Sequence, residues 1–239
     1  MRFISHVLTS ALVVVALSSA RGVQAQTTDV SGHYEGAISS PAGEISIQID
    51  LTKDAKGDMM GTLTIPAQKL TGFPLTNVVV KGQDVAFDIA TSGGGYFRGE
   101  LAGNGISGEF STQMGPFPLT LERAGEAHTF SAPKSALVSK DIEGVWNGTL
   151  DADGGMRVVV KLENLSDGTA TGRLISVDEN NLELPAGIVQ DGTKLTLTLP
   201  MVGSSYVGTV NLAGTDISGT YTTSRGPAFA LVLKRASGN

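Results

Sequence analysis

The stretch IEGVWNGTL, residues Ile142–Leu150, repeats in outline the earlier stretch VSGHYEGAI, residues Val30–Ile38. Each contains Gly-x-aromatic-x-Gly, and each stands just ahead of a run in which apolar residues recur at every second position. Alternation with a period of two places apolar side chains on one face of a β-strand and the intervening side chains on the other. The repeated stretch therefore predicts two similar β-domains in one chain.

Further landmarks recur in the same order and with matching spacing in the two halves of the chain. Such self-similarity indicates a duplicated structural unit. The copies run over residues Val30–Ala124 and Ile142–Ala236. The matching segments are Lys56–Gly61 with Asp167–Gly172, Ile106–Gly108 with Ile217–Gly219, Gly115–Pro116 with Gly226–Pro227, and Leu121–Ala124 with Leu233–Ala236.

Short alternating runs separated by turn residues dominate each copy, and their spacing predicts about eight antiparallel strands. Eight strands are enough to close a small barrel around its own side chains. We therefore expect an all-β protein of two tandem up-and-down, lipocalin-like barrels, with packed interiors favoured over cavities. An open sandwich is the second choice. In the first copy, the strands are expected to begin near Gly32, Glu44, Met59, Leu75, Asp84, Tyr96, Ile106 and Leu119.

The N-terminal segment has the composition of a cleavable signal peptide. Arg2 supplies a positive charge, Val7–Leu17 is apolar, and small residues precede the bond after Ala25. We expect cleavage there and a periplasmic or secreted mature protein. Between the copies, a stretch without a clear period contains Pro133 and indicates a linker, long enough to separate two domains. The expected organisation is a signal peptide at 1–25, a barrel at 26–124, the linker at 125–141 and a barrel at 142–239.

Charge and cysteine content exclude several classes of function. The formal net charge is -6 and the basic residues are scattered, so the concentrated basic patch that nucleic-acid binding requires is not expected. Because the chain has no cysteine, it has no disulfide, no thiolate nucleophile and no cysteine-based metal site. After the signal peptide, no apolar run is long enough for a membrane-spanning helix. We expect no cofactor and no nucleic-acid partner.

An aromatic residue near the start of each copy is matched by an arginine near its end. The pairs are Tyr34 with Arg123 and Trp146 with Arg235. An aromatic side chain can fill one end of a barrel while a guanidinium covers its ring and joins the first strand to the last. We predict this barrel-closing role for all four residues. The pattern resembles the signature of the calycin group, which includes the lipocalins and fatty-acid-binding proteins.

A second resemblance extends over almost the whole of each copy. The segments that carry it, in the second copy, are GVWNGTL, DGTATG, QDGTKLTLTLP, SYVGTV, ISGTYTTSRGP and LVLKRA. They are similar to the β-rich accessory module that precedes the catalytic domain in secreted bacterial serine hydrolases and peptidases. In that family the chemistry belongs to the following α/β domain, so the resemblance implies an exported accessory module and transfers no catalytic residue to this chain.

Histidines and hydroxyls are the first candidates for catalysis. His33 begins a predicted strand and His128 lies in the linker, and a general base must be held in position by a third group. Ser131 and Lys134 have Ser-x-x-Lys spacing, but that motif works on a helix, and Pro133 in a linker provides none. We therefore expect no catalytic residue among them.

Carboxylates and glycines in turns are the remaining candidates. Asp151 with Asp153, and Asp178 with Glu179, are neighbouring acids, but both pairs fall in turn-rich stretches where Asp is common. The glycine-rich stretch Thr91–Gly95 leads into a strand, so it indicates a hairpin and not the phosphate-binding loop that precedes a helix. We expect no metal-binding or cofactor-binding residue.

The residues therefore favour an exported, non-catalytic binding or interaction module. Its partner is expected to be a small apolar ligand or an envelope protein. The alternatives are an accessory subunit of a separately encoded secreted hydrolase and an enzyme of unrecognised type.

Overall fold

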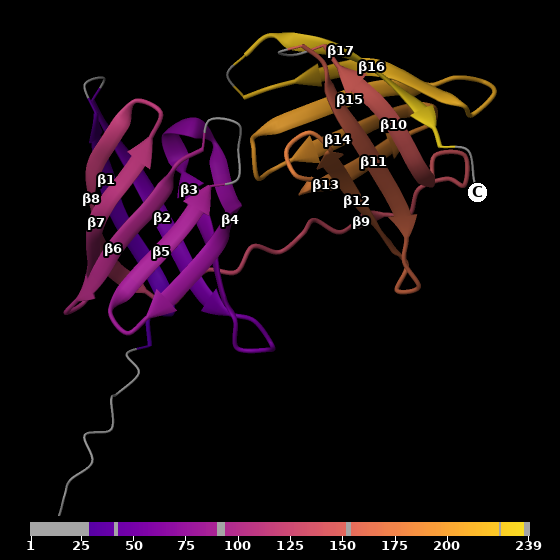
Figure 1. Ribbon diagram of the computed structural model, residues 1–239. Coiled ribbons are helices and arrows are strands. Elements are labelled where there is room, and N and C mark those ends of the chain that lie inside the picture. Colours follow the sequence, from indigo (N-terminus) through magenta and orange to yellow (C-terminus); the bar gives the residue numbers. More distant parts are fainter. Residues whose placement is uncertain (1–28, 41–42, 90–93, 152–153, 225, 237–239) are drawn as a thin grey trace, which may run out of the picture.

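The protein consists of two antiparallel β-barrels joined by an extended segment (Figure 1). The structure, a computed structural model, describes residues 29–40, 43–89, 94–151, 154–224 and 226–236. The predicted signal peptide at 1–25 lies outside these described residues. Within the described ranges, no helix is both long and apolar enough to cross a membrane.

The first barrel is a meander in which each strand pairs antiparallel with the next and the last strand returns to the first. One 3-10 turn, η1 (Pro66–Gln68), lies between the third and fourth strands. The strands are β1 (Gly32–Ser40), β2 (Gly43–Lys53), β3 (Met59–Ile65), β4 (Leu70–Lys81), β5 (Asp84–Ile89), β6 (Tyr96–Ala102), β7 (Gly105–Thr112) and β8 (Gly115–Gly125).

The second barrel has the same up-and-down order, closed where its last strand meets its first. The two-residue strand β9 (Ser135–Ala136) of the connecting segment adds to this sheet beside β12. The prediction of two eight-stranded barrels is confirmed, and the open sandwich is not formed. The barrel strands are β10 (Gly144–Leu150), β11 (Met156–Asn164), β12 (Thr169–Ser176), β13 (Leu182–Asp191), β14 (Lys194–Leu199), β15 (Ser204–Val210), β16 (Asp216–Thr222) and β17 (Ala228–Arg235).

Two strands of the first barrel begin earlier than expected. β4 starts at Leu70 and not near Leu75, and β8 starts at Gly115 and not near Leu119. Prolines lie in both early segments, and proline is depleted in strands because it cannot donate to the hydrogen-bond ladder. Here the chain continues the ladder through these prolines, so the turn signal was misleading.

Both barrel interiors are filled with large apolar side chains. In the first barrel, the rings of Phe87 and Phe97 stack with their centres 4.9 Å apart. In the second, Trp146 and Tyr206 are fully buried, and the Tyr206 hydroxyl donates to the carbonyl oxygen of Ile217 at 2.9 Å. The other fully buried side chains of the first barrel include Tyr34, Ile49, Leu51, Ile106 and Leu121, and those of the second include Leu195, Leu197, Leu199 and Leu233.

The four predicted barrel-closing residues lie at the seams between first and last strands. Tyr34 is paired in register with Arg123, and Trp146 with Arg235. The guanidinium carbon of Arg235 lies 4.3 Å from the centre of the Trp146 ring, which is a cation–π contact. Arg123 donates to the carbonyl oxygen of Ser31, just before β1. Each arginine thus links the end of its barrel to the chain entering the first strand.

The segment between the barrels is packed against protein and is not a free tether. The side chain of Asn164 donates to the carbonyl oxygen of Val138 and accepts from its N–H, both at 2.9 Å. Val138 is buried in the core cluster of the second barrel. Lys134 pairs with Asp167 at 2.7 Å. These hydrogen bonds and the ion pair fix this end of the segment to the second barrel.

The barrels also contact each other directly. The N–H of Thr71 in β4 donates to the carbonyl oxygen of Met201 at 2.9 Å. Phe73 of the same strand belongs to the apolar cluster of the second barrel, which includes Met201. A Cβ added at Gly203 would lie 2.8 Å from Lys69 of the first barrel, so the two surfaces meet closely here. The start of β4 and the turn before β15 therefore form a contact between the barrels.

Candidate functional site: a His–Asp–His cluster beside an apolar groove

Two strands place a histidine and an aspartate side by side on the outer wall of the first barrel. His33 on β1 and Asp50 on β2 are direct register partners. Their neighbours Tyr34, Ile49 and Leu51 are buried in the core, so the alternation of a strand turns His33 and Asp50 outward. The His33 Nδ1 and Asp50 Oδ1 atoms are 2.8 Å apart.

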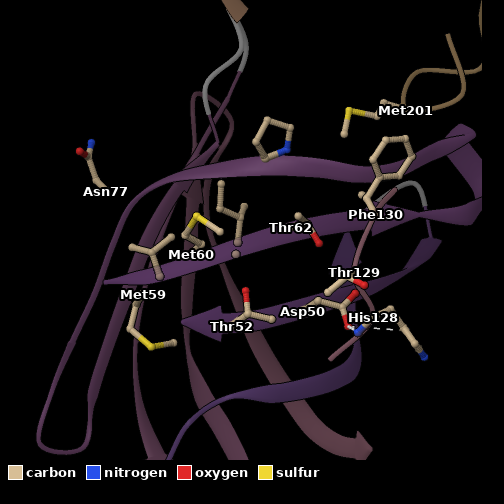
Figure 2. A pocket seen from close by; sticks show the side chains of 15 residues that line it. Asp50, Thr52, Met59, Met60, Thr62, Asn77, His128, Thr129, Phe130 and Met201 are labelled. Atoms are coloured by element: carbon tan, nitrogen blue, oxygen red, sulfur yellow. Dashed lines mark hydrogen bonds and ion pairs between the residues drawn. The ribbon is translucent and has the colours of Figure 1, made fainter. Parts of the chain in front are cut away.

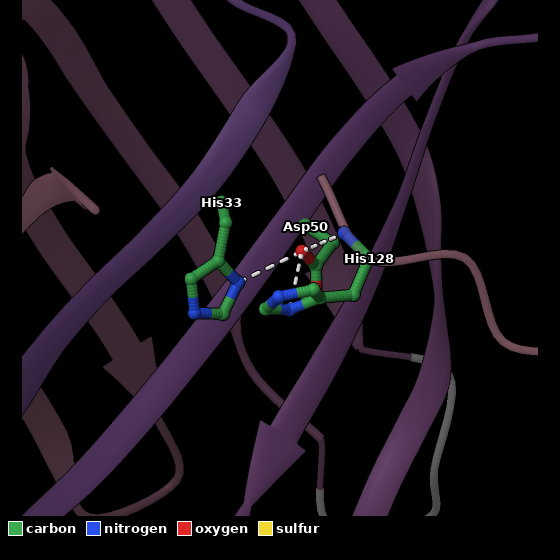
Figure 3. Close-up of side chains that lie close together, drawn as sticks. All are labelled: His33, Asp50 and His128. Atoms are coloured by element: carbon green, nitrogen blue, oxygen red, sulfur yellow. Dashed lines mark hydrogen bonds and ion pairs between the residues drawn. The ribbon is translucent and has the colours of Figure 1, made fainter. Parts of the chain in front are cut away.

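The connecting segment brings the second histidine to the same carboxylate. The backbone N–H of His128 donates to Asp50 Oδ1 at 2.7 Å, and its ring nitrogen Nδ1 lies 3.5 Å from that oxygen. The rings of His33 and His128 are 4.1 Å apart between centres and tilted by 55°. Figure 3 shows both imidazoles directed at Asp50. Two strands and the inter-barrel segment thus meet at one carboxylate.

Burial differs strongly within this His–Asp–His cluster. The side chains of His33 and Asp50 are 6% and 8% exposed, although they stand on the outer wall, whereas that of His128 is 73% exposed. The second ring nitrogen of His33, Nε2, lies 3.3 Å from Glu35 Oε1. A buried carboxylate needs charged or hydrogen-bonding partners. The cluster supplies them and leaves one imidazole facing solvent.

A groove of about 390 Å³ adjoins the cluster (Figure 2). It lies over strands β2, β3 and β4, and Asp50 and His128 belong to its wall. Most of the lining is apolar, and Met201 of the second barrel closes one part of it. The apolar lining residues are Met59, Met60, Pro74, Leu75, Val78, Phe130 and Met201.

Local irregularities in β4 shape this groove. Asn77 has φ 50, and the register with β5 shifts between Thr76 and Val79, which marks a β-bulge. Gly72 has φ 63, and a Cβ there would lie 3.0 Å from Phe130 of the connecting segment. Glycine is therefore required where the Phe130 ring lies against the strand. The groove has an apolar wall beside a cluster that can bind a proton or a cation.

Where the structure describes them, the other candidates from the sequence are not assembled into a site. Ser131 is exposed, and the ammonium of Lys134 pairs with Asp167, which lowers the pKa of that carboxyl to about 2. Asp178 accepts from the side chain and the N–H of Arg157, and the side-chain hydrogen bond lowers its pKa. These groups have structural partners. Asp153 and residues 91–93 lie outside the described residues.

The sequence predicts no site at His33 or His128, because the two histidines lie in separate segments without an evident third group. The group that brings the two histidines together is Asp50. The alternating pattern of β2 places Asp50 on the polar face of the strand and indicates nothing more about it. The sequence did hold one signal for this pair. His33 and Asp50 are equally far from the short connection between their strands, so a hairpin places them opposite each other. The approach of His128, 78 residues from Asp50, had no local signal because it depends on how the connecting segment packs.

Comparisons with known proteins provide no family for this chain. No family model matches it, and neither does any curated protein. Among solved structures, one match is a protein of unknown function from the DUF3598 family of Nostoc punctiforme, with 16% identity over 87% of this chain and 96% of that one, and a TM-score of 0.26. Another is a "putative outer membrane protein" from Bacteroides fragilis, with 12% identity over 87% and 98% of the chains and a TM-score of 0.28. TM-scores this low support no argument about fold or function.

Proposed function

We propose that the protein is an exported, non-catalytic binding module that holds a small apolar molecule in the groove on the first barrel. The observation that carries this proposal is an apolar groove of about 390 Å³ on a protein whose barrel interiors are filled. Its volume lies in the range of small-molecule sites, from about 300 to 1,000 Å³. The outer wall is therefore a better candidate for ligand binding than a lipocalin-like interior.

The chemistry of the lining supports an apolar ligand. Met59, Met60 and Met201 contribute flexible, polarisable thioethers, which adapt to ligands of varied shape. Phe130 adds an aromatic ring, and Asp50 with His128 adds polar groups at one part of the wall. An apolar site with a few polar groups both binds and orients its ligand. Export rests on the predicted signal peptide at 1–25.

The first test measures binding of N-phenyl-1-naphthylamine, a neutral fluorescent probe, to the purified protein. Met60→Asp places a charge in the groove, and we expect the affinity to fall by about tenfold or more because an apolar ligand cannot solvate it. Met114→Asp is the matched control, since Met114 is 84% exposed and lies outside the groove. Equal affinities of the two variants would contradict the proposed site.

A second test identifies the natural ligand and examines the non-catalytic assignment. Native mass spectrometry of protein recovered from its own exported compartment should show a stoichiometric adduct that is lost on denaturation. A screen with ester and peptide substrates should show no turnover. Hydrolysis that disappears in His128→Ala would overturn the assignment and make the protein an enzyme.

A further inference from the structure

We propose that His33, Asp50 and His128 bind one divalent transition-metal ion, with Zn²⁺ as the reference ion. Each residue offers one ligand atom, and these atoms all lie within 4.8 Å of one another. Two imidazoles and one carboxylate form a ligand set suited to zinc and to other ions of its class. The site is a property of the cluster and does not depend on the apolar groove having a ligand.

The distances between the ligand atoms are close to those around an ion of this size. Zinc bonds to nitrogen and oxygen are about 2.0–2.2 Å, so two ligands in a tetrahedral site lie about 3.3–3.5 Å apart. The Nδ1 atoms of His33 and His128 lie 2.8 and 3.5 Å from Asp50 Oδ1. The His128 distance already matches a tetrahedral separation, whereas the His33 distance is that of a hydrogen bond, so coordination requires the His33 and Asp50 side chains to move apart around the ion.

The surroundings of His33 match those of a metal-bound imidazole. Its Nδ1 faces the cluster, and its Nε2 faces Glu35 Oε1 at 3.3 Å. Metal-binding histidines usually donate their other ring N–H to a carboxylate or carbonyl oxygen, which fixes the tautomer and the ring orientation. The Gln48 amide also donates to Glu35 Oε1, at 3.4 Å, and so helps to orient it. The outer partner of the metal site is thus already in place.

The open side of the cluster gives an ion access to it. His128 is largely exposed, while His33 and Asp50 are buried beneath it. Three protein ligands leave the fourth tetrahedral position for water or for a group of a bound molecule. Because Asp50 and His128 also line the groove, that position adjoins the groove.

Metal binding would also tie the connecting segment to the first barrel. Two ligands come from the paired strands β1 and β2, and the third comes from the segment that leads to the second barrel. A metal bound by ligands distant in the sequence stabilises the folded arrangement by its binding free energy. The ion is therefore expected to strengthen the attachment of the inter-barrel segment.

Isothermal titration of chelator-treated protein with ZnCl₂ tests the proposal. We expect one ion per chain, and Co²⁺ should give the intense visible absorption of a tetrahedral site. His128→Ala removes an exposed ligand, so the variant should still fold. Its affinity for zinc should fall on the order of 100-fold or more, which exceeds the loss expected when only a hydrogen-bond partner of a ligand is removed. Glu126→Gln is the matched control, because it removes a nearby charge from the same segment without touching a ligand, and its affinity should be unchanged.

Two further variants separate the contribution of the outer partner Glu35 from that of the buried ligand Asp50. Glu35→Gln should weaken zinc binding by about 10- to 100-fold because the oriented carboxylate is lost. Asp50→Asn keeps an oxygen that can accept from the His128 N–H but removes the charge, so it should abolish binding while circular dichroism remains that of the folded protein. Binding of equal affinity in His128→Ala, or no binding to the parent protein at about 1 mM Zn²⁺, would overturn the proposal.

Discussion

At the scale of single residues, the aromatic side chain at the start of each barrel is held by the chain that precedes it. The Trp146 Nε1–H donates to the carbonyl oxygen of Ile142, and the Tyr34 hydroxyl donates to that of Val30, both at 2.9 Å. Each partner stands four residues upstream and is itself buried. Arg235 then covers the Trp146 ring. The polar atom of each aromatic residue therefore has a hydrogen-bond partner although its surroundings are apolar, and buried polar atoms need such partners.

Substitution of this tryptophan should destabilise the second barrel. Trp146→Ala removes a fully buried indole, and we expect the free energy of unfolding to fall by about 3–5 kcal/mol through lost burial and a residual cavity. Urea denaturation followed by circular dichroism measures the change. Val145→Ala is the control, because Val145 is exposed on the opposite face of β10, and its cost should be about 1 kcal/mol or less. Equal stabilities of the two variants would refute the barrel-closing role.

At the scale of elements, the second glycine of Gly-x-aromatic-x-Gly lets the first and last strands approach each other. A Cβ at Gly36 of β1 would lie 2.2 Å from the carbonyl oxygen of Thr120 in β8. At Gly148 of β10, it would lie 2.9 Å from the carbonyl oxygen of Val232 in β17. Contacts this short with backbone atoms cannot be relieved by a side-chain rotation. The motif therefore combines a core aromatic residue with a position where the barrel seam excludes any side chain.

Gly36→Ala should open the seam of the first barrel. We expect a loss of about 1–3 kcal/mol from the overpacked contact with Thr120, together with faster hydrogen exchange at the β1 and β8 amides. Gly125→Ala at the end of β8 is the matched control, since no atom lies within 4 Å of its added Cβ. Hydrogen exchange with mass spectrometry reports both variants. Unchanged protection of β1 in Gly36→Ala would show that the seam accommodates a methyl group.

At the scale of the whole molecule, the two barrels are docked and not merely tethered. The contact joins the start of β4 to the turn before β15, through the Thr71–Met201 hydrogen bond and the burial of Phe73. The connecting segment contributes to both sides, through His128 on the first barrel and Val138 on the second. Domain interfaces of limited area permit relative motion unless they are sufficiently apolar. The position of the second barrel therefore depends on a few apolar residues.

A charge at this contact should separate the barrels. Met201→Asp places a carboxylate at a position that is 8% exposed. The free energy required to bury an unpaired charge exceeds the stabilisation that such a small contact provides. We expect small-angle X-ray scattering to show a larger radius of gyration, with the strand content unchanged by circular dichroism. Leu212→Asp, on a fully exposed turn of the second barrel, should leave the scattering curve as it is. An unaltered radius of gyration in Met201→Asp would mean that other contacts hold the barrels together.

The sequence alone determined the architecture of this protein, because the relevant signals are local. Alternation along Ile45–Leu51 and turn residues every few positions predicted the strands, and their number predicted closure into barrels. Tyr34 and Trp146 stand near the start of their copies, and Arg123 and Arg235 stand near the end. A closed meander places its first strand beside its last, so these residues become neighbours. In the first barrel, the two strands that contain prolines, β4 and β8, begin several residues earlier than expected.

The tertiary structure alone decided the candidate site. His33 and Asp50 could have been paired from the register of one hairpin, but His128 reaches them only because the connecting segment packs across the outer wall of the first barrel. The groove likewise depends on Met201 from the second barrel and on Phe130 lying against Gly72. Such contacts join residues far apart in the chain, and they are set by the packing of whole surfaces. Periodicity within a strand holds no information about them, so the site appears only when the barrels and the segment between them are placed together.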